Sequence, residues 1–282
     1  MVLVLITWAG MSLAGLARRS LQLSGEAAAA QERLQRRWGT ISCRQMILDR
    51  AEKLLESRAA DVKPEELTWP LPRALGGKFA LGGLEFEVYL SDEDAKANLN
   101  AIYRHVPEKV RSIVGQLVGG AAGGGISTNV RLPEASLLNR DPTPFQSWGQ
   151  VFEPHPTNDP KRIPQSIRTA THQMTCWGSG KLNVRRADDA TVRAVCETAV
   201  SADAIGQLLA LRSEPGQTGL SALTGRMTIH NKDRTALRQL IIDESRCHSL
   251  WVVCRNDLRT WTTLIVDHPG DGSGSEYVHF TW

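Results

Sequence analysis

The chain has 282 residues and a mass of 31.0 kDa, and 41% of its residues are hydrophobic. This length and composition suffice for a sizeable buried core, so they exclude a wholly disordered chain. Lys and Arg number 33 against 30 Asp and Glu, and a net charge of +3 is a poor match to a dedicated polyanion binder. The 5 cysteines form no CxxC pair, which argues against a zinc ribbon and a dense disulfide scaffold.

The first 17 residues are uncharged and mostly apolar, and Arg18 and Arg19 follow directly. At about 1.5 Å per helical residue, this segment has the length of a short membrane span. A cleaved secretory signal normally begins with basic residues, whereas apolar residues begin at Met1 here, although the segment ends in small residues that suit a signal peptidase. We expect a retained anchor, with a cleaved signal or a buried helix as alternatives. The side chains expected in lipid are Leu3, Leu5, Trp8 and Leu13.

The helical pattern continues beyond the two arginines. Leu34, Ile41, Leu48 and Leu55 recur with a spacing of seven residues, and Trp38 and Ala51 fill the same apolar stripe. We therefore expect one helix from Met1 to about Arg58, terminated by Pro64, in which residues 18–62 form an amphipathic continuation of the anchor. This part is expected to lie against a folded domain, and the alternative is an anchor followed by a coiled-coil stalk.

The pattern then changes to that of strands. Alternating apolar residues over 84–90 predict a half-buried strand, which forms a hairpin with residues 78–81 across Gly82 and Gly83. Residues 63–94 are thus expected to be the first part of an α+β domain. Its second part is expected over 215–282, with strands at 226–230, 249–254, 261–266 and 277–282, and a strand or helical turn at 237–242.

Residues 95–214 are expected to form an α-helical subdomain inserted into this domain. A helix over 102–118 is interrupted by Pro107, and a flexible glycine-rich loop follows at 119–125. A short helix is expected at 145–151. Asp188 and Ser201 can each cap a short helix, and the two helices form a hairpin. The order of helix, strands, helices and strands predicts an α+β fold with a helical insert.

Few motifs indicate catalysis. The glycine run at 119–125 lacks the lysine with which a phosphate-binding loop reaches its ligand. Ser179 lies between two glycines but outside a GxSxG elbow, so a turn is its expected role. Cys247, His248 and Cys254 fit no standard zinc spacing, and buried thiols or one disulfide are expected there instead.

Two groups of oxygen donors are of the kind that calcium accepts. The first consists of Asp92, Glu93 and Asp94 with Asn98, and the second of Asp267, Asp271 and Glu276. Neither group has the spacing of an EF-hand, so we expect both to be solvated turns. Asp92, Glu93 and Asp94 remain weak calcium candidates, and no other cofactor is expected.

Short motifs along nearly the whole chain occur in an order typical of one family. They are the apolar opening that ends in ARRS at 17–20, GKF at 77–79, DEDAKANLN at 92–100, PFQSW at 144–148 and WGSGKLN at 177–183. In this order they resemble the K-type minor pseudopilin of type II secretion systems, general secretion pathway protein K.

The resemblance implies a non-enzymatic protein at the tip of the pseudopilus, a fibre anchored in the inner membrane with its globular part in the periplasm. It implies a pilin-like helix and sheet interrupted by a large helical domain. Other minor pseudopilins, the major pseudopilin and membrane lipid are the implied partners. Neither nucleic acid nor a small-molecule substrate is expected. The stripe from Leu34 to Leu55 is then expected to pack on the chain's own sheet and on partner subunits.

Members of the family are made as precursors that a prepilin peptidase cuts before the apolar helix. Here that helix begins at Met1, so we expect either an upstream start or a different route of maturation. Most pilin-like subunits carry a glutamate at the fifth mature position, which pairs with a neighbour's amine in lipid. No acidic residue occurs among the first 17 residues, as in the K-type member, which suits a subunit with nothing stacked above it.

A second hypothesis comes from the predicted helical hairpin. It resembles the helix-hairpin-helix of membrane-anchored DNA-uptake receptors, in which a glycine between the helices lets backbone N–H groups approach phosphate. The join at 197–201 contains no glycine, and Glu197 would repel a phosphate. We therefore prefer the pseudopilin hypothesis.

Overall fold

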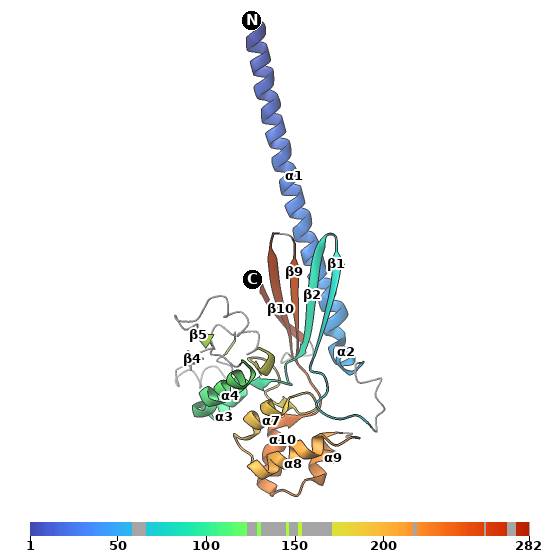
Figure 1. Cartoon of the computed structure of the whole chain (residues 1–282), viewed down its shortest axis with the longest axis vertical. Helices are drawn as coiled ribbons and strands as arrows, with labels where there is room; N and C mark the ends of the chain where they lie inside the picture. The colour runs from blue at the N-terminus through green and yellow to red at the C-terminus, as the bar shows by residue number, and fades with distance from the viewer. Residues whose placement is uncertain are drawn as a thin grey trace.

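The computed structural model describes residues 1–57, 66–122, 129–130, 145–146, 152–153, 171–216, 219–256, 258–269 and 275–281. The N-terminal helix projects as a rod from an elongated body, and a sheet lies beside the end of this rod (Figure 1). The helices of the insert lie at the end of the body that is farthest from the N-terminus. The predicted α+β class, with a long N-terminal helix on an antiparallel sheet and an inserted α-helical subdomain, is confirmed.

The rod is helix α1, Val2–Ile47, which is followed by a 3₁₀ turn at Leu48–Arg50 and by helix α2, Ala51–Ser57. The prediction of one helix from Met1 to about Arg58 is confirmed in extent, with the 3₁₀ turn as an interruption that the pattern did not indicate. Leu48 and Leu55 are buried against the sheet, so tertiary packing stabilises the last part of the rod.

Five antiparallel strands form the main sheet in the order β1-β2-β9-β10-β11. Their bounds are Ala74–Leu81, Leu84–Asp92, His248–Arg255, Thr260–Pro269 and Ser275–Thr281. Strands β1 and β2 are joined by Gly82 and Gly83, whose φ angles of 58° and 83° suit glycine and form a two-residue hairpin turn. The strands predicted at 249–254, 261–266 and 277–282 correspond to β9, β10 and β11, and Trp282 lies outside the described residues.

Each face of the sheet packs on helices over part of its area. On one face, Leu84, Phe86 and Leu90 pack with residues of α1 and α2 in a first core. On the other face, Leu264 and Val266 pack with residues of the insert in a second core. Ile265, between them in β10, belongs to the first core, as the alternation of side chains along a strand requires. Strand β10 therefore contributes side chains both to the core shared with the helical rod and to the core shared with the insert.

The insert consists of all elements between β2 and β9. In the part of the insert that the structure describes, the helices with defined bounds are α3 (Leu99–His105), a 3₁₀ turn (Pro107–Lys109), α4 (Val110–Ala122), α7 (Asp189–Cys196), α8 (Ala202–Arg212), α9 (Leu220–Arg226) and α10 (Asn231–Leu240). Short strands pair β3 (Ala97–Asn98) with β6 (Met174–Thr175), β4 (Asn129–Val130) with β5 (Phe152–Glu153), and β7 (Leu182–Asn183) with β8 (Ile241–Ile242).

The boundary expected at residue 214 is too early. Helices α9 and α10 follow it, and the chain returns to the main sheet only at His248. Leu223 and Leu237 of these helices are buried in the second core with the rest of the insert. Packing of α9 and α10 with the insert therefore sets the end of the subdomain at the start of β9.

The strand predicted at 226–230 is wrong. Arg226 ends α9, and the next residues connect it to α10. The backbone N–H and C=O of Thr228 bind the side-chain amide of Gln207, at 3.0 and 3.2 Å, in place of a strand partner. The segment at 237–242 is mainly the end of α10, followed by the two residues of β8.

Several local predictions in the insert are confirmed. Pro107 separates α3 from α4, and the side chains of Asp188 and Ser201 accept hydrogen bonds from the first turns of α7 and α8. Helix α4 extends to Ala122, into the expected glycine loop. The remainder of that loop and most of the helix expected at 145–151 lie outside the described residues.

Candidate functional site

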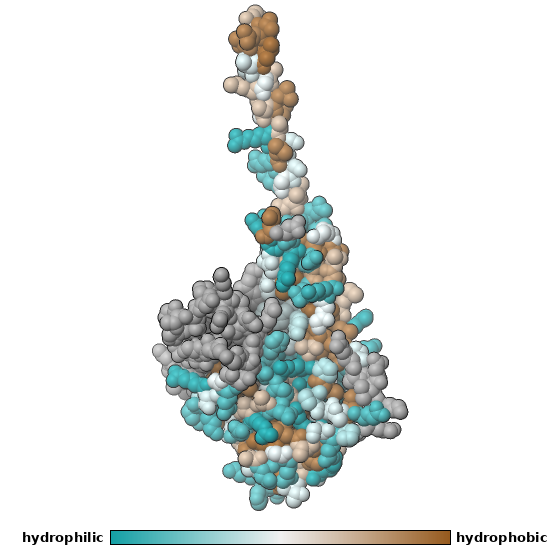
Figure 2. Space-filling model, in the orientation of Figure 1, coloured by the Kyte–Doolittle hydropathy of each residue, from teal (hydrophilic) through white to brown (hydrophobic). Residues whose placement is uncertain are grey.

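The N-terminal end of α1 presents a large apolar surface. Figure 2 shows this end in brown, well away from the body. The expected anchor residues Leu3, Leu5, Trp8 and Leu13 are all at least 62% exposed. The hydroxyl of Thr7 donates to backbone carbonyls of Leu3 and Val4, at 3.1 and 2.9 Å, so its hydrogen bond is satisfied within the helix. Within the described residues, one helix is long and apolar enough to cross a membrane, by length and composition alone, and this is that helix.

The amphipathic stripe divides into two parts. Leu48 and Leu55 are buried in the first core, and Ile41 is half-buried. Leu34 and Trp38, in contrast, are 57% and 62% exposed. Leu34 and Trp38 therefore do not pack on the chain's own sheet, and the expected contact with partner subunits stays a prediction for them.

In this part of α1 the buried residues are Gly39 and Cys43, where the apolar stripe was expected to be buried. A Cβ atom on Gly39 would lie 2.5 Å from Cζ of Phe86 in strand β2, so the absence of a side chain lets α1 approach the sheet closely. The apolar pattern does not mark this position, because glycine carries no apolar side chain. Gly10, Gly15 and Gly25 lie in the same helix and a Cβ atom there has nothing within 4 Å, so the presence of a glycine does not by itself mark the contact.

Polar side chains fix the rotation of α1 on the sheet. Oε1 of Glu32 accepts a hydrogen bond from Nδ2 of Asn256 at 2.9 Å. The guanidinium of Arg36 lies 4.7 Å from the ring centre of Trp261, and that of Arg44 lies 5.0 Å from the ring centre of Tyr277. These contacts hold one face of the helix against the sheet, and they leave the apolar face of Leu34 and Trp38 exposed.

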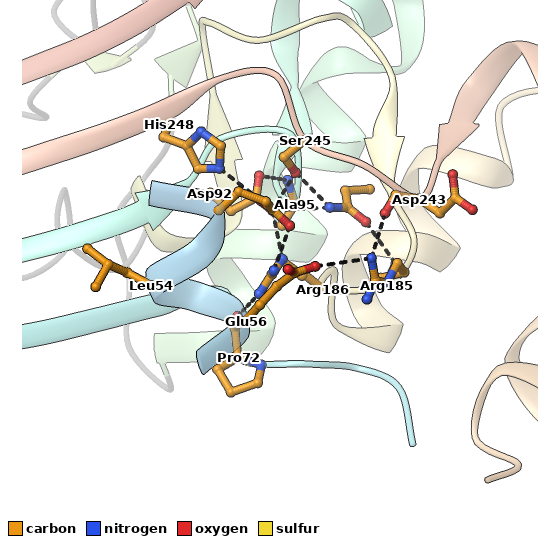
Figure 3. A network of polar contacts seen from close by, with 12 residues as sticks. Leu54, Glu56, Pro72, Asp92, Ala95, Arg185, Arg186, Asp243, Ser245 and His248 are labelled. Carbon is orange, nitrogen blue, oxygen red and sulfur yellow. Dashed lines mark hydrogen bonds and ion pairs between the residues drawn. The ribbon is translucent and has the colours of Figure 1, made fainter. Parts of the chain in front are cut away.

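A buried polar junction connects the rod, the sheet and the insert (Figure 3). Asp92, Glu93 and Asp94 follow the end of β2, and each is at most 2% exposed. The expectation that they form a solvated turn is wrong, because their carboxylates bind groups of the insert and of β9. The burial of these three residues was not predictable from the sequence, because three consecutive acidic residues are typical of an exposed turn.

Asp92 binds three groups in this junction. Its Oδ2 atom accepts from Oγ of Ser245 at 2.6 Å and from Nδ2 of Asn183 at 3.2 Å, and it lies 3.5 Å from Nε of Arg186. Burial raises the pKa of Asp92 to about 6, against the opposing effects of His248, Ser245 and Arg186. The side chain is therefore held by the insert and is close to its protonation range at neutral pH.

Helix α2 reaches the same junction through Glu52. Its carboxylate accepts from Nη2 of Arg186 at 2.8 Å and lies 3.2 Å from Nε2 of His248. Although burial acts to raise it, the hydrogen bonds of His248 and Arg186 lower the pKa of Glu52 to about 2. Burial acts to lower the pKa of His248, but the bond to Glu52 and the charge of Asp92 raise it. A second pair, Glu56 with Arg185 at 3.6 Å, supports the same connection.

Glu93 and Asp94 complete the junction. Oε1 of Glu93 lies 2.5 Å from Nζ of Lys96 and accepts from the hydroxyl of Ser249. The carboxylate of Asp94 accepts from the backbone and hydroxyl of Ser179 at 2.7 and 2.9 Å, and from the backbone of Arg246 at 2.8 Å. Ser179 therefore lies in a turn, as expected, and the turn is attached to Asp94.

The contacts of Asp92, Glu93 and Asp94 show how these weak calcium candidates are occupied. The two carboxylates of Asp92 and Asp94 are engaged by protein donors, and the charge of Glu93 is paired with Lys96. No group of three or more His, Cys, Asp or Glu side chains suited to a metal ion occurs in the part of the chain that the structure describes. In the second group of acids, Asp271 lies outside this part and Asp267 lies in β10.

All 5 cysteines are buried and free. Cys247 and Cys254 thus form no disulfide, and of the two expected accounts the structure has buried thiols. Burial raises the pKa of Cys43 to about 11 and that of Cys196 to about 12, so these thiols are protonated at neutral pH.

The helical hairpin expected from the sequence is formed by α7 and α8. Arg212 of α8 is buried, donates to the carbonyls of Val184 and Ala187 at 3.1 and 2.8 Å, and lies 2.6 Å from Asp189. The hairpin therefore helps to hold the insert together through an arginine that the sequence analysis did not single out. Nothing in these contacts favours the DNA-binding hypothesis.

No family model matches the sequence, and no curated protein matches it. Among solved structures, the chain is similar to one chain of the GspK-GspI-GspJ complex from the type 2 secretion system of enterotoxigenic Escherichia coli. The identity is 15% and the TM-score 0.49, over 91% of this chain and 99% of the other.

Proposed function

We propose that this chain is a non-enzymatic minor pseudopilin that lies at the tip of a type II secretion pseudopilus and helps to start fibre assembly and protein export. In this proposal the apolar end of α1 crosses the inner membrane once and the body lies in the periplasm. Other minor pseudopilins and the major pseudopilin are its partners. The order of the family-like sequence motifs supports the proposal.

The observation that carries it is the division of α1 into surfaces. The N-terminal residues are apolar and exposed, and the end of the helix is fixed to the body. Between these parts, Leu34 and Trp38 form an apolar surface that faces away from the chain's own sheet. Such a surface suits the helix of a second, similarly anchored subunit, because both helices would leave the membrane side by side.

The shape of the insert supports the position at the tip. The insert lies at the end of the body farthest from the membrane helix (Figure 1), where it widens the molecule. A wide element suits the end of a fibre better than its interior, since subunits stacked beyond it would have to accommodate its width. Its attachment through the buried junction keeps it fixed relative to α1.

The anchor is tested by the double substitution Leu5→Arg and Leu13→Arg. Each arginine costs about 2.5–3.5 kcal/mol at the centre of a membrane helix, so the variant is expected in the soluble fraction after cell lysis. The matched control is Leu21→Arg with Leu23→Arg, which places the same charges on exposed positions beyond Arg18 and Arg19. Membrane association of both variants alike would refute the anchor.

Assembly is tested by co-purification with the other minor pseudopilins of the same organism. Leu34→Asp with Trp38→Asp is expected to reduce the recovered complex without reducing stability, because both side chains are exposed. The control is Leu258→Asp, because Leu258 in the β9–β10 loop is 89% exposed. If the amount of recovered complex is unchanged, Leu34 and Trp38 are not part of the subunit interface. Salt-dependent binding of DNA by the protein would instead favour the hypothesis of a DNA-uptake receptor.

A further inference from the structure

Strand β1 forms one edge of the main sheet (Figure 1). Within the described residues it pairs with β2 and with no second strand. All its residues from Gly76 to Leu81 are exposed. An exposed edge of this length can accept another extended chain through backbone hydrogen bonds.

The hairpin turn determines which backbone groups are free for this. Leu81 and Leu84 flank a two-residue turn, and residues in this position exchange both backbone hydrogen bonds. Because the pattern alternates along the strand, the N–H and C=O groups of Ala80, Lys78 and Gly76 point away from β2. These residues provide donors and acceptors with the spacing of an antiparallel or parallel strand pair.

On the face covered by α1, the edge is apolar. Phe79 stacks on Phe86 with ring centres 4.9 Å apart, yet it remains 39% exposed, and Leu81 is 43% exposed. A strand added to β1 would place every second side chain beside these two residues. Apolar side chains at those positions would cover them.

On the opposite face, the edge borders an open groove of about 380 Å³, and the residues on this face that line it are Lys78, Ala80, Glu85, Glu87, Val253 and Arg255. Lys78 and Arg255 lie 3.8 and 3.3 Å from the carboxylate of Glu87. Glu85 has two cross-strand neighbours, Arg255 in β9 and Ala80 in β1. Within the described residues Glu85 forms no ion pair, because the guanidinium of Arg255 is bonded to Glu87 instead. Ala80 is too small to cover Glu85 from the edge of the sheet. A side chain beside Ala80 would start two strand spacings, roughly 10 Å, from the backbone of β2, a distance that an arginine and a glutamate span together.

We propose that the edge of β1 is a docking site for an extended segment of another polypeptide, which adds a strand to the sheet. The segment alternates, with apolar side chains that cover Phe79 and Leu81 and with a basic side chain on the other face that reaches Glu85 across Ala80. Antiparallel pairing of two copies of β1 would direct their α1 helices in opposite directions. The preference for a different chain over a second copy thus rests on the proposed membrane anchor, whereas the docking site itself does not.

The probe is a fluorescent peptide, Thr-Val-Thr-Val-Arg-Val-Thr-Val-Thr, added to the full-length protein in detergent micelles, with fluorescence anisotropy as the readout. Binding is expected, with slower hydrogen exchange at the amides of Gly76, Lys78 and Ala80. A version with a central Glu is expected to bind more weakly, and Glu85→Gln is expected to remove this difference. A version with methylated backbone nitrogens is expected not to bind.

Lys78→Pro provides the decisive variant, because it removes one outward N–H while proline is tolerated on an edge strand. It is expected to weaken binding about tenfold, the effect of one lost hydrogen bond of about 1.4 kcal/mol. Lys78→Ala is the matched control, since it also loses the contact with Glu87 but keeps the N–H, and it is expected to bind as the wild type does.

Three results would overturn the proposal. They are equal peptide binding by the Lys78→Pro and Lys78→Ala variants, equal binding of the methylated and unmethylated peptides, and no binding of the peptide with the central Arg. Sedimentation without peptide distinguishes self-association, which would assign the edge to a second copy. These results are independent of the membrane-fractionation test.

Discussion

Nη2 of Arg186 lies 2.8 Å from Oε1 of Glu52, although the two residues are 134 positions apart. Arg186 belongs to the insert and Glu52 to helix α2. The same guanidinium donates through Nη1 to the carbonyl of Pro72 at 2.8 Å and approaches Asp92 through Nε. A single buried side chain therefore binds the rod, the end of β2 and the segment that leads into β1.

Arg186→Met is expected to destabilise the protein by about 3–5 kcal/mol, because it removes a buried cation and leaves Asp92 buried without it. The free energy of unfolding, measured by chemical denaturation in detergent, checks this. Arg193→Met on the exposed face of α7 is the control and is expected to change stability by less than about 0.5 kcal/mol. If both variants unfold like the wild type, Arg186 does not connect these elements energetically.

Gly39→Ala is expected to destabilise the packing of α1 on the sheet by about 1–3 kcal/mol, because the new methyl group overlaps the ring of Phe86. Gly25→Ala is the matched control, since a Cβ atom there has nothing within 4 Å. Thermal unfolding of the two variants gives the comparison. A Gly39→Ala protein as stable as the wild type would show that the helix does not need this close approach.

His248→Gln is expected to reduce stability in a pH-dependent manner. The pKa of His248 is raised in the folded protein, so protonation stabilises the fold fully below the unfolded pKa of about 6.5, and this contribution is lost as pH rises through the folded pKa. The difference in unfolding free energy between wild type and variant should therefore be largest near pH 6 and smaller near pH 9. A difference that grows with pH would contradict the pairing of His248 with Glu52.

The cysteines give a prediction about covalent structure. A maleimide reagent is expected to leave the folded protein unmodified, because all 5 thiols are buried, and to add 5 groups per chain in guanidinium without a reductant. Mass spectrometry counts the adducts. Fewer adducts on the unfolded chain would reveal a disulfide, for which Cys247 and Cys254 were the expected pair.

Local patterns were reliable where a residue's neighbours in sequence are also its neighbours in space. The alternation over 84–90 predicted β2, and Asp188 and Ser201 were correctly placed as helix caps. The strand expected at 226–230 failed because side-chain bonds from Gln207 occupy its backbone, a contact that no local pattern contains.

The sequence by itself determined that an apolar helical rod leads into a sheet and that a helical unit interrupts this sheet, because periodicity and capping act over a few residues. The tertiary structure decided which face of the rod meets the sheet, since the close approach at Gly39 and the contacts of Arg36 and Arg44 set its rotation. It also decided that Asp92, Glu93 and Asp94 are buried, because their partners come from distant parts of the chain. Burial and charge pairing depend on such long-range contacts, and a local pattern does not encode them.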